Sequence, residues 1–256
     1  MKIASWNVNS LRVRLEHVLD WLGSAQPDIL AIQETKTKDP EFPVDAFAQS
    51  GYAVAFAGQP TYNGVALVSR HPIESTIHDL ADFADEQRRV LGATVGALRV
   101  INLYVPNGQS VDSQKYQYKL SWLAALRAHL ADELREHEHC VVLGDFNIAP
   151  EDRDVHDPEK WLGKVLCSAP EREALNNILA LGFVDTFRLF ETGDGNFSWW
   201  DYRAAAFRRN LGLRIDLVLA SNALARACTA ASIDVEPRRR ERPSDHTPVI
   251  AEFAID

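Results

Sequence analysis

Acidic and amide side chains follow apolar stretches at several points along the chain. One such stretch leads into Asp145 and Asn147, and another, residues 29–32, leads to Glu34. Carboxylate and amide oxygens are the ligands that Mg²⁺ and Mn²⁺ prefer in proteins. Asp145 and Asn147 alone would also suit an Asx turn, and Glu34 alone a solvated loop. Their joint occurrence favours a divalent metal site.

A second group of chemically useful residues lies near the C-terminus. Asp245 and His246 are adjacent, and Asp216 lies inside an apolar, strand-like run. Because burial of an unpaired charge is costly, Asp216 needs a partner, and we expect it to be His246. A metal would polarise a phosphoryl oxygen, an aspartate would orient or deprotonate water, and a histidine and an asparagine would bind the developing charge.

No serine nucleophile motif of the type Gly-x-Ser-x-Gly and no Gly-x-x-x-x-Gly-Lys phosphate loop occurs in the sequence. The candidate residues therefore predict hydrolysis of a phosphodiester by direct attack of water, rather than through a covalent intermediate.

The elements that would position these residues are mostly strands. Short runs rich in β-branched, aliphatic and aromatic residues occur at 2–6, 29–32, 52–56, 64–69, 91–95, 98–104, 140–144, 215–219 and 248–253. Helical spacing of apolar residues predicts helices over 11–23, 113–136 and 170–181. Strands do not alternate strictly with helices, which argues against a doubly wound sheet or an eight-unit barrel. We expect an α/β sandwich of two mixed sheets packed face to face, with outer helices, forming one domain over residues 1–256.

Four of the predicted strands lead into polar residues, namely Asn7, Glu34, Tyr104 and Asp145. If these strand ends meet at one rim of the sandwich, an amide, two carboxylates and a phenol converge there. Rigid strands would hold them in place.

Composition limits the classes of protein that the chain can represent. It is 46% hydrophobic and 25% charged, as soluble globular proteins are. No apolar run approaches the roughly 20 residues of a membrane span, and the N-terminus lacks a signal-peptide pattern. The three cysteines are too sparse for a disulfide framework or a zinc site. We expect a cytoplasmic protein that has no membrane partner.

The net charge of −9 argues against a general nucleic-acid coat protein. It does not exclude a nucleic-acid enzyme, because only the contact face needs to be basic.

The ordered motifs identify a resemblance to the exonuclease III and apurinic/apyrimidinic endonuclease family, within the wider endonuclease/exonuclease/phosphatase superfamily. The matching segments cover essentially the whole chain: Ser-Trp-Asn-Val-Asn-Ser-Leu-Arg at 5–12, Leu-Ala-Ile-Gln-Glu-Thr-Lys at 30–36, Gly-Val-Ala-Leu at 64–67, Arg-Arg-Val at 88–90, Ile-Asn-Leu-Tyr-Val-Pro-Asn-Gly at 101–108, Gly-Asp-Phe-Asn at 144–147, Gly-Phe-Val-Asp-Thr-Phe-Arg at 182–188, Phe-Ser-Trp-Trp-Asp-Tyr-Arg at 197–203, Gly-Leu-Arg-Ile-Asp at 212–216 and Ser-Asp-His at 244–246. The resemblance implies a four-layered α/β sandwich and a Mg²⁺-dependent DNA repair nuclease, with Mn²⁺ as an alternative ion.

The resemblance also implies roles for single residues. Glu34 is the main expected metal ligand, and the expected metal-binding group comprises Asn7, Glu34, Asp145, Asn147, Asp245 and His246. Asp145 is expected to activate water with the help of Asn147, and Tyr104 to contact the scissile phosphate. His246 is expected to bind the phosphate while Asp216 orients its imidazole. Which of Asp145, Tyr104 and His246 is the general base stays open.

The expected substrate is double-stranded DNA with abasic sites or with damaged or recessed 3′ ends, bound by a monomer. Arg89, Trp199, Arg203 and Arg208 are the expected DNA contacts, since aromatic rings and arginines suit bases and phosphates. The run 238–242 is expected to be a solvated loop.

Cys167, Trp199 and Leu213 are expected to line the pocket for a flipped-out abasic sugar. Many family members have an aromatic residue near the position of Cys167. The smaller cysteine either still admits an abasic sugar or shifts the preference toward 3′ ends.

Three alternatives accompany this interpretation. One is a 3′-end-processing exonuclease or phosphatase with little abasic endonuclease activity. Another is a superfamily phosphatase acting on small or lipid substrates, which Arg88, Arg89 and the Phe-Ser-Trp segment at 197–199 disfavour. The last is a DNA-binding protein without catalysis, which would have no use for the carboxylate and histidine set.

Overall fold

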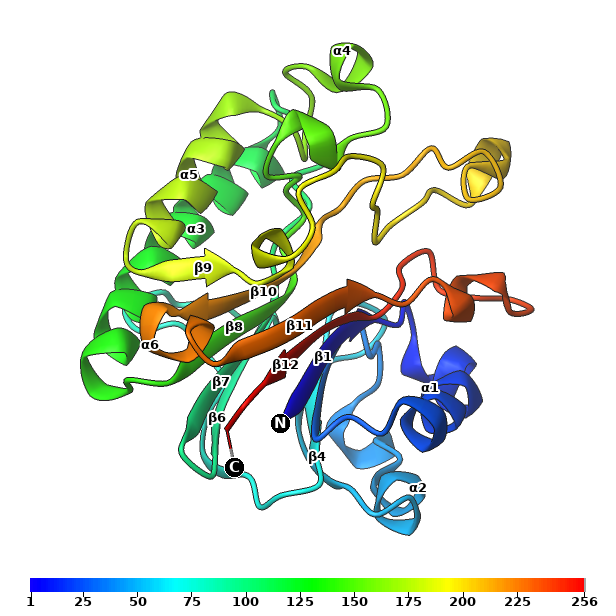
Figure 1. Ribbon diagram of the computed structural model, residues 1–256, viewed down its shortest axis with the longest axis vertical. Coiled ribbons are helices and arrows are strands. Elements are labelled where there is room, and N and C mark those ends of the chain that lie inside the picture. The colour runs from blue at the N-terminus through cyan, green and yellow to red at the C-terminus, as the bar shows by residue number, and fades with distance from the viewer. Residues whose placement is uncertain (256) are drawn as a thin grey trace.

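The computed structural model describes residues 1–255, and its framework is two six-stranded sheets packed face to face (Figure 1). The first sheet runs in the order β11 (Cys228–Ile233), β12 (Val249–Phe253), β1 (Lys2–Asn7), β2 (Ile29–Gln33), β4 (Val65–Ser69) and β3 (Ala53–Ala57). The second runs β5 (Glu74–Ile77), β6 (Val90–Val95), β7 (Leu98–Tyr104), β8 (Cys140–Asp145), β10 (Asp216–Ser221) and β9 (Phe183–Asp185). Both sheets are mixed, as predicted.

Helices cover the outer faces of the two sheets. Helices α1 (Leu11–Ala25) and α2 (Val44–Gln49) pack on the first sheet, while α3 (Gln114–Glu136) and α5 (Ala169–Leu179) pack on the second. Between the sheets lies an apolar core to which the first sheet contributes Ile3 and Leu67 and the second Val100 and Leu143. The four-layered α/β sandwich is therefore confirmed.

The helices and strands with clear apolar spacing lie close to their predicted bounds. Three strands escaped prediction: β5 and β11 because their side chains are largely exposed or only half-buried, and β9 because it has three residues. Helix α2 and the one-turn helices α4 (Pro158–Trp161) and α6 (Asn222–Ala225) were also missed. Such short segments bury too little surface to leave a periodic pattern. No helix within residues 1–255 is long and apolar enough to cross a bilayer.

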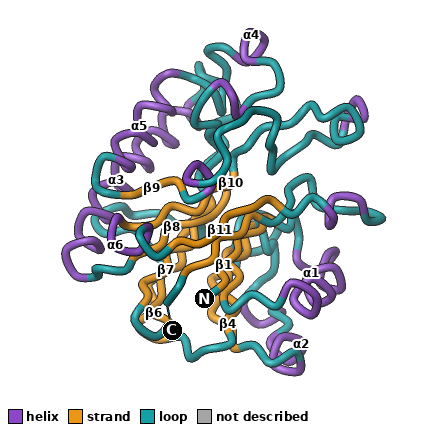
Figure 2. The backbone as a smooth tube through the Cα atoms, in the orientation of Figure 1, coloured by secondary structure: helices purple, strands orange, loops and turns teal. Residues whose placement is uncertain are grey.

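Parallel pairing brings the chemically useful strand ends to one rim. Strand β1 runs parallel to β2, and β7 runs parallel to β8. Asn7, Gln33, Tyr104 and Asp145 thus end four strands on the same side of the sandwich. Loops and helices, rather than further strands, follow these ends, and Figure 2 shows loops over much of the upper right-hand side of the molecule.

A polar tie joins the two sheets just below this rim. The Nε2 atom of Gln33 donates to Oδ1 of Asn102 at 2.7 Å, and Nδ2 of Asn102 donates to the carbonyls of Ile32 and Ala66 at 3.0 and 2.8 Å. Both side chains are completely buried. Hydrogen bonds that satisfy buried amides favour one register of the sheets over others, which sets the spacing of the rim.

Candidate active site

Three donor groups form a compact cluster at the rim. One ligand atom each from Glu34, Asp145 and His246 lies within 4.8 Å of the others. Asn7 bridges the two carboxylates, since its Nδ2 donates to Oε1 of Glu34 and to Oδ2 of Asp145, both at 2.9 Å. The rim therefore unites residues from β1, from the turn after β2, from β8 and from the loop before β12.

The backbone around these residues is unusual in a way that the sequence explains. Gly144 has φ +146°, and a Cβ atom there would meet the carbonyl oxygen of Leu103 at 1.9 Å. Only glycine permits this close approach of β8 to β7 directly before Asp145. Glu34 and Asn147 both adopt left-handed φ values, +52° and +50°. Non-glycine residues in that region are uncommon and concentrate at functional sites.

His246 is held by a buried carboxylate. The oxygens of Asp216 lie 2.9 and 3.1 Å from Nδ1 of His246, and Ser198 Oγ donates to Asp216 Oδ2 at 2.6 Å. Both partners are at most 4% exposed. Nε2 of His246 faces the cluster, 3.7 Å from Oδ2 of Asp145. His246 is thus the partner that the buried Asp216 requires.

The surroundings raise the pKa values of Asp145 and His246. Burial raises the pKa of Asp145 to about 7, with Asp216 and Glu34 adding to the rise and His246 opposing it. Burial would lower the pKa of His246, but the charges of Asp216 and then Asp145 outweigh it and raise the value to about 10. At neutral pH the imidazole is therefore a cation, and Asp145 lies near the midpoint of its titration.

The balance of charges at the rim indicates whether a divalent metal ion would fit there. Four carboxylates, those of Glu34, Asp145, Asp216 and Asp245, lie around the rim. Among residues 1–255, only His246 and Lys36 carry positive charge in contact with them. Nζ of Lys36 lies 2.8 Å from Oε2 of Glu34. Burial is the main cause of the raised pKa of Asp145, and the neighbouring carboxylates of Asp216 and Glu34 add to it. Oxygen donors with excess negative charge suit a hard divalent ion.

Tyr104 lies beside the cluster with its phenol protonated. Burial raises the pKa of Tyr104 well above its ordinary value, and the neighbouring Glu34 and Asp145 raise it further. The guanidinium of Arg89 stacks over the ring at 4.7 Å and donates to the Tyr104 carbonyl at 3.1 Å. Arg89 therefore holds the tyrosine in place, and its Nε also donates to Oε1 of Gln87 at 3.0 Å.

Asn147 is anchored on both sides of its amide. Its Oδ1 accepts from Nδ2 of Asn107 at 3.0 Å, and its Nδ2 donates to the carbonyl of Val105 at 3.0 Å. The buried Lys119 donates to the Asn147 carbonyl at 2.6 Å and pairs with Glu171. The sequence analysis missed Asn107 and Lys119, although Asn107 lies inside the matched motif 101–108.

Asp245 lies beside the cluster rather than within it. Its Oδ1 accepts from Asn9 at 2.9 Å and its Oδ2 from the indole of Trp199 at 3.1 Å. Burial would raise the pKa of Asp245, but His246, Asn9 and Trp199 outweigh it and lower the value. Asn9 is a further rim residue that was missed, because a lone asparagine in a loop is unremarkable in sequence.

The three residues expected at the lesion pocket do lie together. Cys167 and Leu213 belong to one apolar cluster, and Trp199 packs against it. Trp199 also pairs through its backbone with Leu213 on one side and His246 on the other. Cys167, Leu213 and Trp199 therefore form a largely buried apolar cluster next to the rim.

The expected basic contacts differ in their environment. Arg208 is exposed and makes no ion pair within residues 1–255. The side chain of Arg203 is 88% exposed and paired with Asp201. The prediction that the run 238–242 is a solvated loop is wrong for Arg238, which is only 7% exposed. Its guanidinium lies 5.4 Å from the ring centre of Tyr202, against which it packs.

Comparisons with known proteins agree with this geometry. A model of the endonuclease/exonuclease/phosphatase family matches residues 4–246. Exodeoxyribonuclease III of Haemophilus influenzae is 36% identical, over 99% of this chain and 100% of that protein. The 3′ phosphatase NExo from Neisseria, solved with a product DNA hairpin, is 48% identical with a TM-score of 0.98, over 100% of both chains. An AP endonuclease from Archaeoglobus fulgidus is 41% identical with a TM-score of 0.96, again over 100% of both chains.

Proposed function

The chain belongs to the endonuclease/exonuclease/phosphatase family, and we propose that it is a single-domain, Mg²⁺-dependent DNA repair nuclease. The membership confirms the resemblance seen in the motifs. The proposed substrates are DNA duplexes with an abasic site, a 3′-phosphate or a recessed 3′ end. Relatives named exodeoxyribonuclease III, 3′ phosphatase and AP endonuclease support this substrate range.

One observation carries the proposal: the convergence of Glu34, Asp145 and His246 within 4.8 Å, with Asn7 between the carboxylates. Glu34 and Asp145 would hold the ion, and Asn7, Asn147 and Asp245 would complete or orient its surroundings. A bound Mg²⁺ supplies polarisation of a phosphoryl oxygen and neutralises charge on the leaving oxygen. His246 is cationic at neutral pH, so its nitrogen has no free electron pair for the metal, and it fits the phosphate better.

The residues of the chain divide the remaining work. Asp145, with a pKa near neutrality, accepts a proton from the attacking water. His246 donates from Nε2 to a phosphate oxygen, while Asp216 keeps the imidazole oriented and charged. Tyr104 stays protonated and donates to another phosphate oxygen. Asn147 is fixed by Asn107 and serves to position water or phosphate.

A second candidate function is 3′-end processing with little abasic endonuclease activity. Cys167 supports it, because it stands near the position where many family members have an aromatic residue that helps to form the abasic pocket. The 48% identity to a 3′ phosphatase points the same way.

Three labelled duplexes test the proposal: one with an internal abasic site, one with a 3′-phosphate and one with a recessed 3′-hydroxyl. Each is incubated with Mg²⁺ and, separately, with a chelator. We expect cleavage or dephosphorylation only with Mg²⁺. Activity that resists the chelator, or inactivity on all three duplexes, would refute it. Strong 3′-phosphate removal with weak abasic cleavage selects the second candidate.

A further inference from the structure

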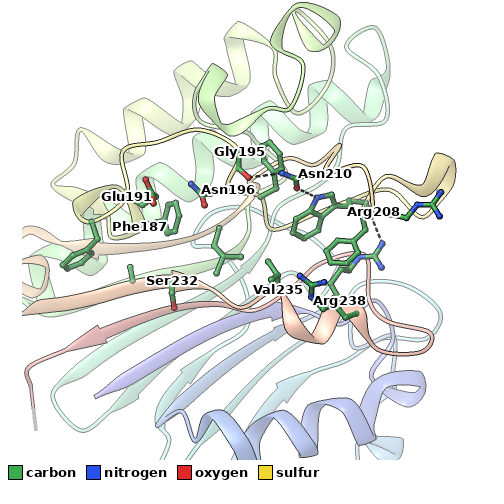
Figure 3. Close-up of a pocket in the computed structure, with 16 residues that line it drawn as sticks. Phe187, Glu191, Gly195, Asn196, Arg208, Asn210, Ser232, Val235 and Arg238 are labelled. Carbon is green, nitrogen blue, oxygen red and sulfur yellow. Dashed lines mark hydrogen bonds between the residues drawn. The ribbon is translucent and has the colours of Figure 1, made fainter.

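A groove separate from the catalytic rim lies along the edge strand β11. Figure 3 shows it between that strand, with Ser232 and Val235 below, and the loop carrying Glu191 and Asn196 above. Its volume is about 940 Å³, at the upper end of the range for ligand pockets. No member of the metal cluster lines it. Trp200 forms part of its wall, whereas its neighbour Trp199 faces the rim.

The floor of the groove is an unpaired sheet edge. Ala231, Ser232 and Ile233 of β11 line it, and β11 is the terminal strand of its sheet. Within the described chain, no strand pairs with its outer edge. An open edge exposes backbone donors and acceptors that can pair with an added strand.

The side walls are apolar and partly exposed. Phe190 is 48% exposed and Phe187 half-buried, and Val235 lies opposite them. Phe197 and Trp200 are only 4% and 2% exposed, so their ring faces are not free to stack on bases. These walls suit apolar side chains of an extended peptide better than nucleotides.

One end of the groove is basic and incompletely satisfied. Arg238 is more than nine-tenths buried, yet within residues 1–255 its only hydrogen bond is from Nη2 to the Trp200 carbonyl at 3.3 Å. Its buried Nε has no hydrogen-bond partner. Arg239 lies beside it, pairs with the exposed Glu236 and packs over the ring of Phe207. A buried donor without a partner is costly, and a carboxylate is the group that satisfies a guanidinium best.

We propose that the groove formed by β11, Phe187, Phe190 and Arg238 binds an extended segment of a partner protein. The segment adds a strand to β11, places apolar side chains against the phenylalanines and places an acidic side chain at Arg238. Glu191 lies at the other end of the groove, while Arg208, Arg238 and Arg239 make the lining basic and suit an acidic side chain. The groove thus serves recruitment, and its occupancy does not depend on hydrolysis of DNA.

A pool of fluorescein-labelled strand-forming peptides tests this proposal. They alternate valine, isoleucine or phenylalanine with serine or threonine and end in aspartates, and binding is followed by fluorescence anisotropy. Two controls accompany them: the pool with lysine in place of aspartate, and the pool with alternate backbone amides methylated. We expect saturable binding of the acidic pool and at least about tenfold weaker binding of every control.

Two substitutions in the groove and one control substitution outside it test where the peptide binds. Phe190→Asp should weaken it about tenfold, whereas Leu189→Asp, at a side chain that is similarly exposed but does not line the groove, should leave it unchanged. Arg238→Met should weaken acidic peptides selectively, and a thermal melt establishes that this variant is folded. If the Arg238→Met variant is unfolded, the difference in peptide affinity between Phe190→Asp and Leu189→Asp still tests the proposal.

The proposal is overturned by any of three results. These are no saturable binding, equal binding of the lysine or methylated pools, and equal affinity of the Phe190→Asp and parent proteins. DNA hydrolysis by the Phe190→Asp variant should match that of the parent, which separates this test from that of the nuclease function.

Discussion

The catalytic rim and the neighbouring flank, residues 199–210, hold their side chains in opposite ways. At the rim, Asp145 and His246 are buried and each has hydrogen-bond or charge partners on several elements. On the flank, Arg203 and Arg208 are exposed, on a segment of loops and turns. Reacting groups must be held to within a fraction of an ångström, whereas phosphate contacts work through charge and tolerate motion.

Trp199 and Trp200 mark the border between the two regions. The indole of Trp199 donates to Asp245 at the rim, and that of Trp200 donates to Asn210 on the flank at 3.1 Å. The contrast implies that rim substitutions mainly lower kcat, whereas flank substitutions mainly alter KM and its dependence on salt.

The largest effect is expected at Asp145. Asp145→Asn keeps the shape of the side chain but removes the proton acceptor, so kcat should fall by about 10²–10⁴-fold. Steady-state kinetics on the most active of the three duplexes measures it, and a thermal melt serves as the folding control. Activity close to that of the parent would remove Asp145 from its proposed role.

Asp216→Asn should have the next largest effect, a loss in kcat of about 10–100-fold, typical of removing a carboxylate that orients a site histidine. The pKa of His246 is raised to about 10 because the carboxylates, Asp216 first and then Asp145, together outweigh burial. Removing the Asp216 carboxylate lowers that pKa, so the alkaline limb of the pH–rate profile should move to lower pH. An unmoved limb would show that His246 does not act as a cation.

Removal of the metal should change stability in a pH-dependent way. The folded pKa of Asp145, about 7, lies above its ordinary 3.8, so the stability contributed by its bound proton is lost as pH rises through about 7. Mg²⁺ can replace that proton. Magnesium at about 100 times its Kd adds about 2.7 kcal/mol to the free energy of unfolding. The increase in Tm with Mg²⁺ over chelator should therefore be larger at pH 8 than at pH 5.

Asp145→Asn is the matched control for that measurement, because an amide does not titrate. In this variant the Mg²⁺-dependent increase in Tm should be small and nearly independent of pH. A parent protein whose response to Mg²⁺ is equal at both pH values would contradict the assignment of Asp145 as a ligand.

The smallest effects are expected on the flank. Arg208→Ala should weaken DNA binding a few-fold and reduce the slope of log affinity against log salt by about one, with kcat unchanged. Arg203→Ala should change the DNA affinity and this slope less, because Arg203 already forms an ion pair with Asp201. Binding titrations at several salt concentrations test both. A large fall in kcat for Arg208→Ala would place that residue at the rim and break the comparison.

Much of the fold was predictable from local patterns. Strand β8 begins with the apolar run Cys140–Leu143, and α5 begins with the Ser168 and Glu171 capping box, so their bounds follow from short-range physics. Strand β11 was not predictable, because its half-exposed side chains become a strand only by pairing with β12.

The sequence by itself determined which residue types follow which strands. Gly144 before Asp145 and an aspartate inside a buried strand at Asp216 both imply close approach or an obligatory partner. The order of the family's motifs along the chain then indicated that these residues belong to one site.

Only the tertiary structure decided which groups touch. It brought Asp216 within 2.9 Å of His246, 30 residues away along the chain, placed Asn107 on the amide of Asn147, and buried Arg238 against Tyr202. Residue type sets what a side chain can do, but its distance to a partner depends on how the two sheets and their loops pack. That packing is a sum over long-range contacts that no local pattern contains.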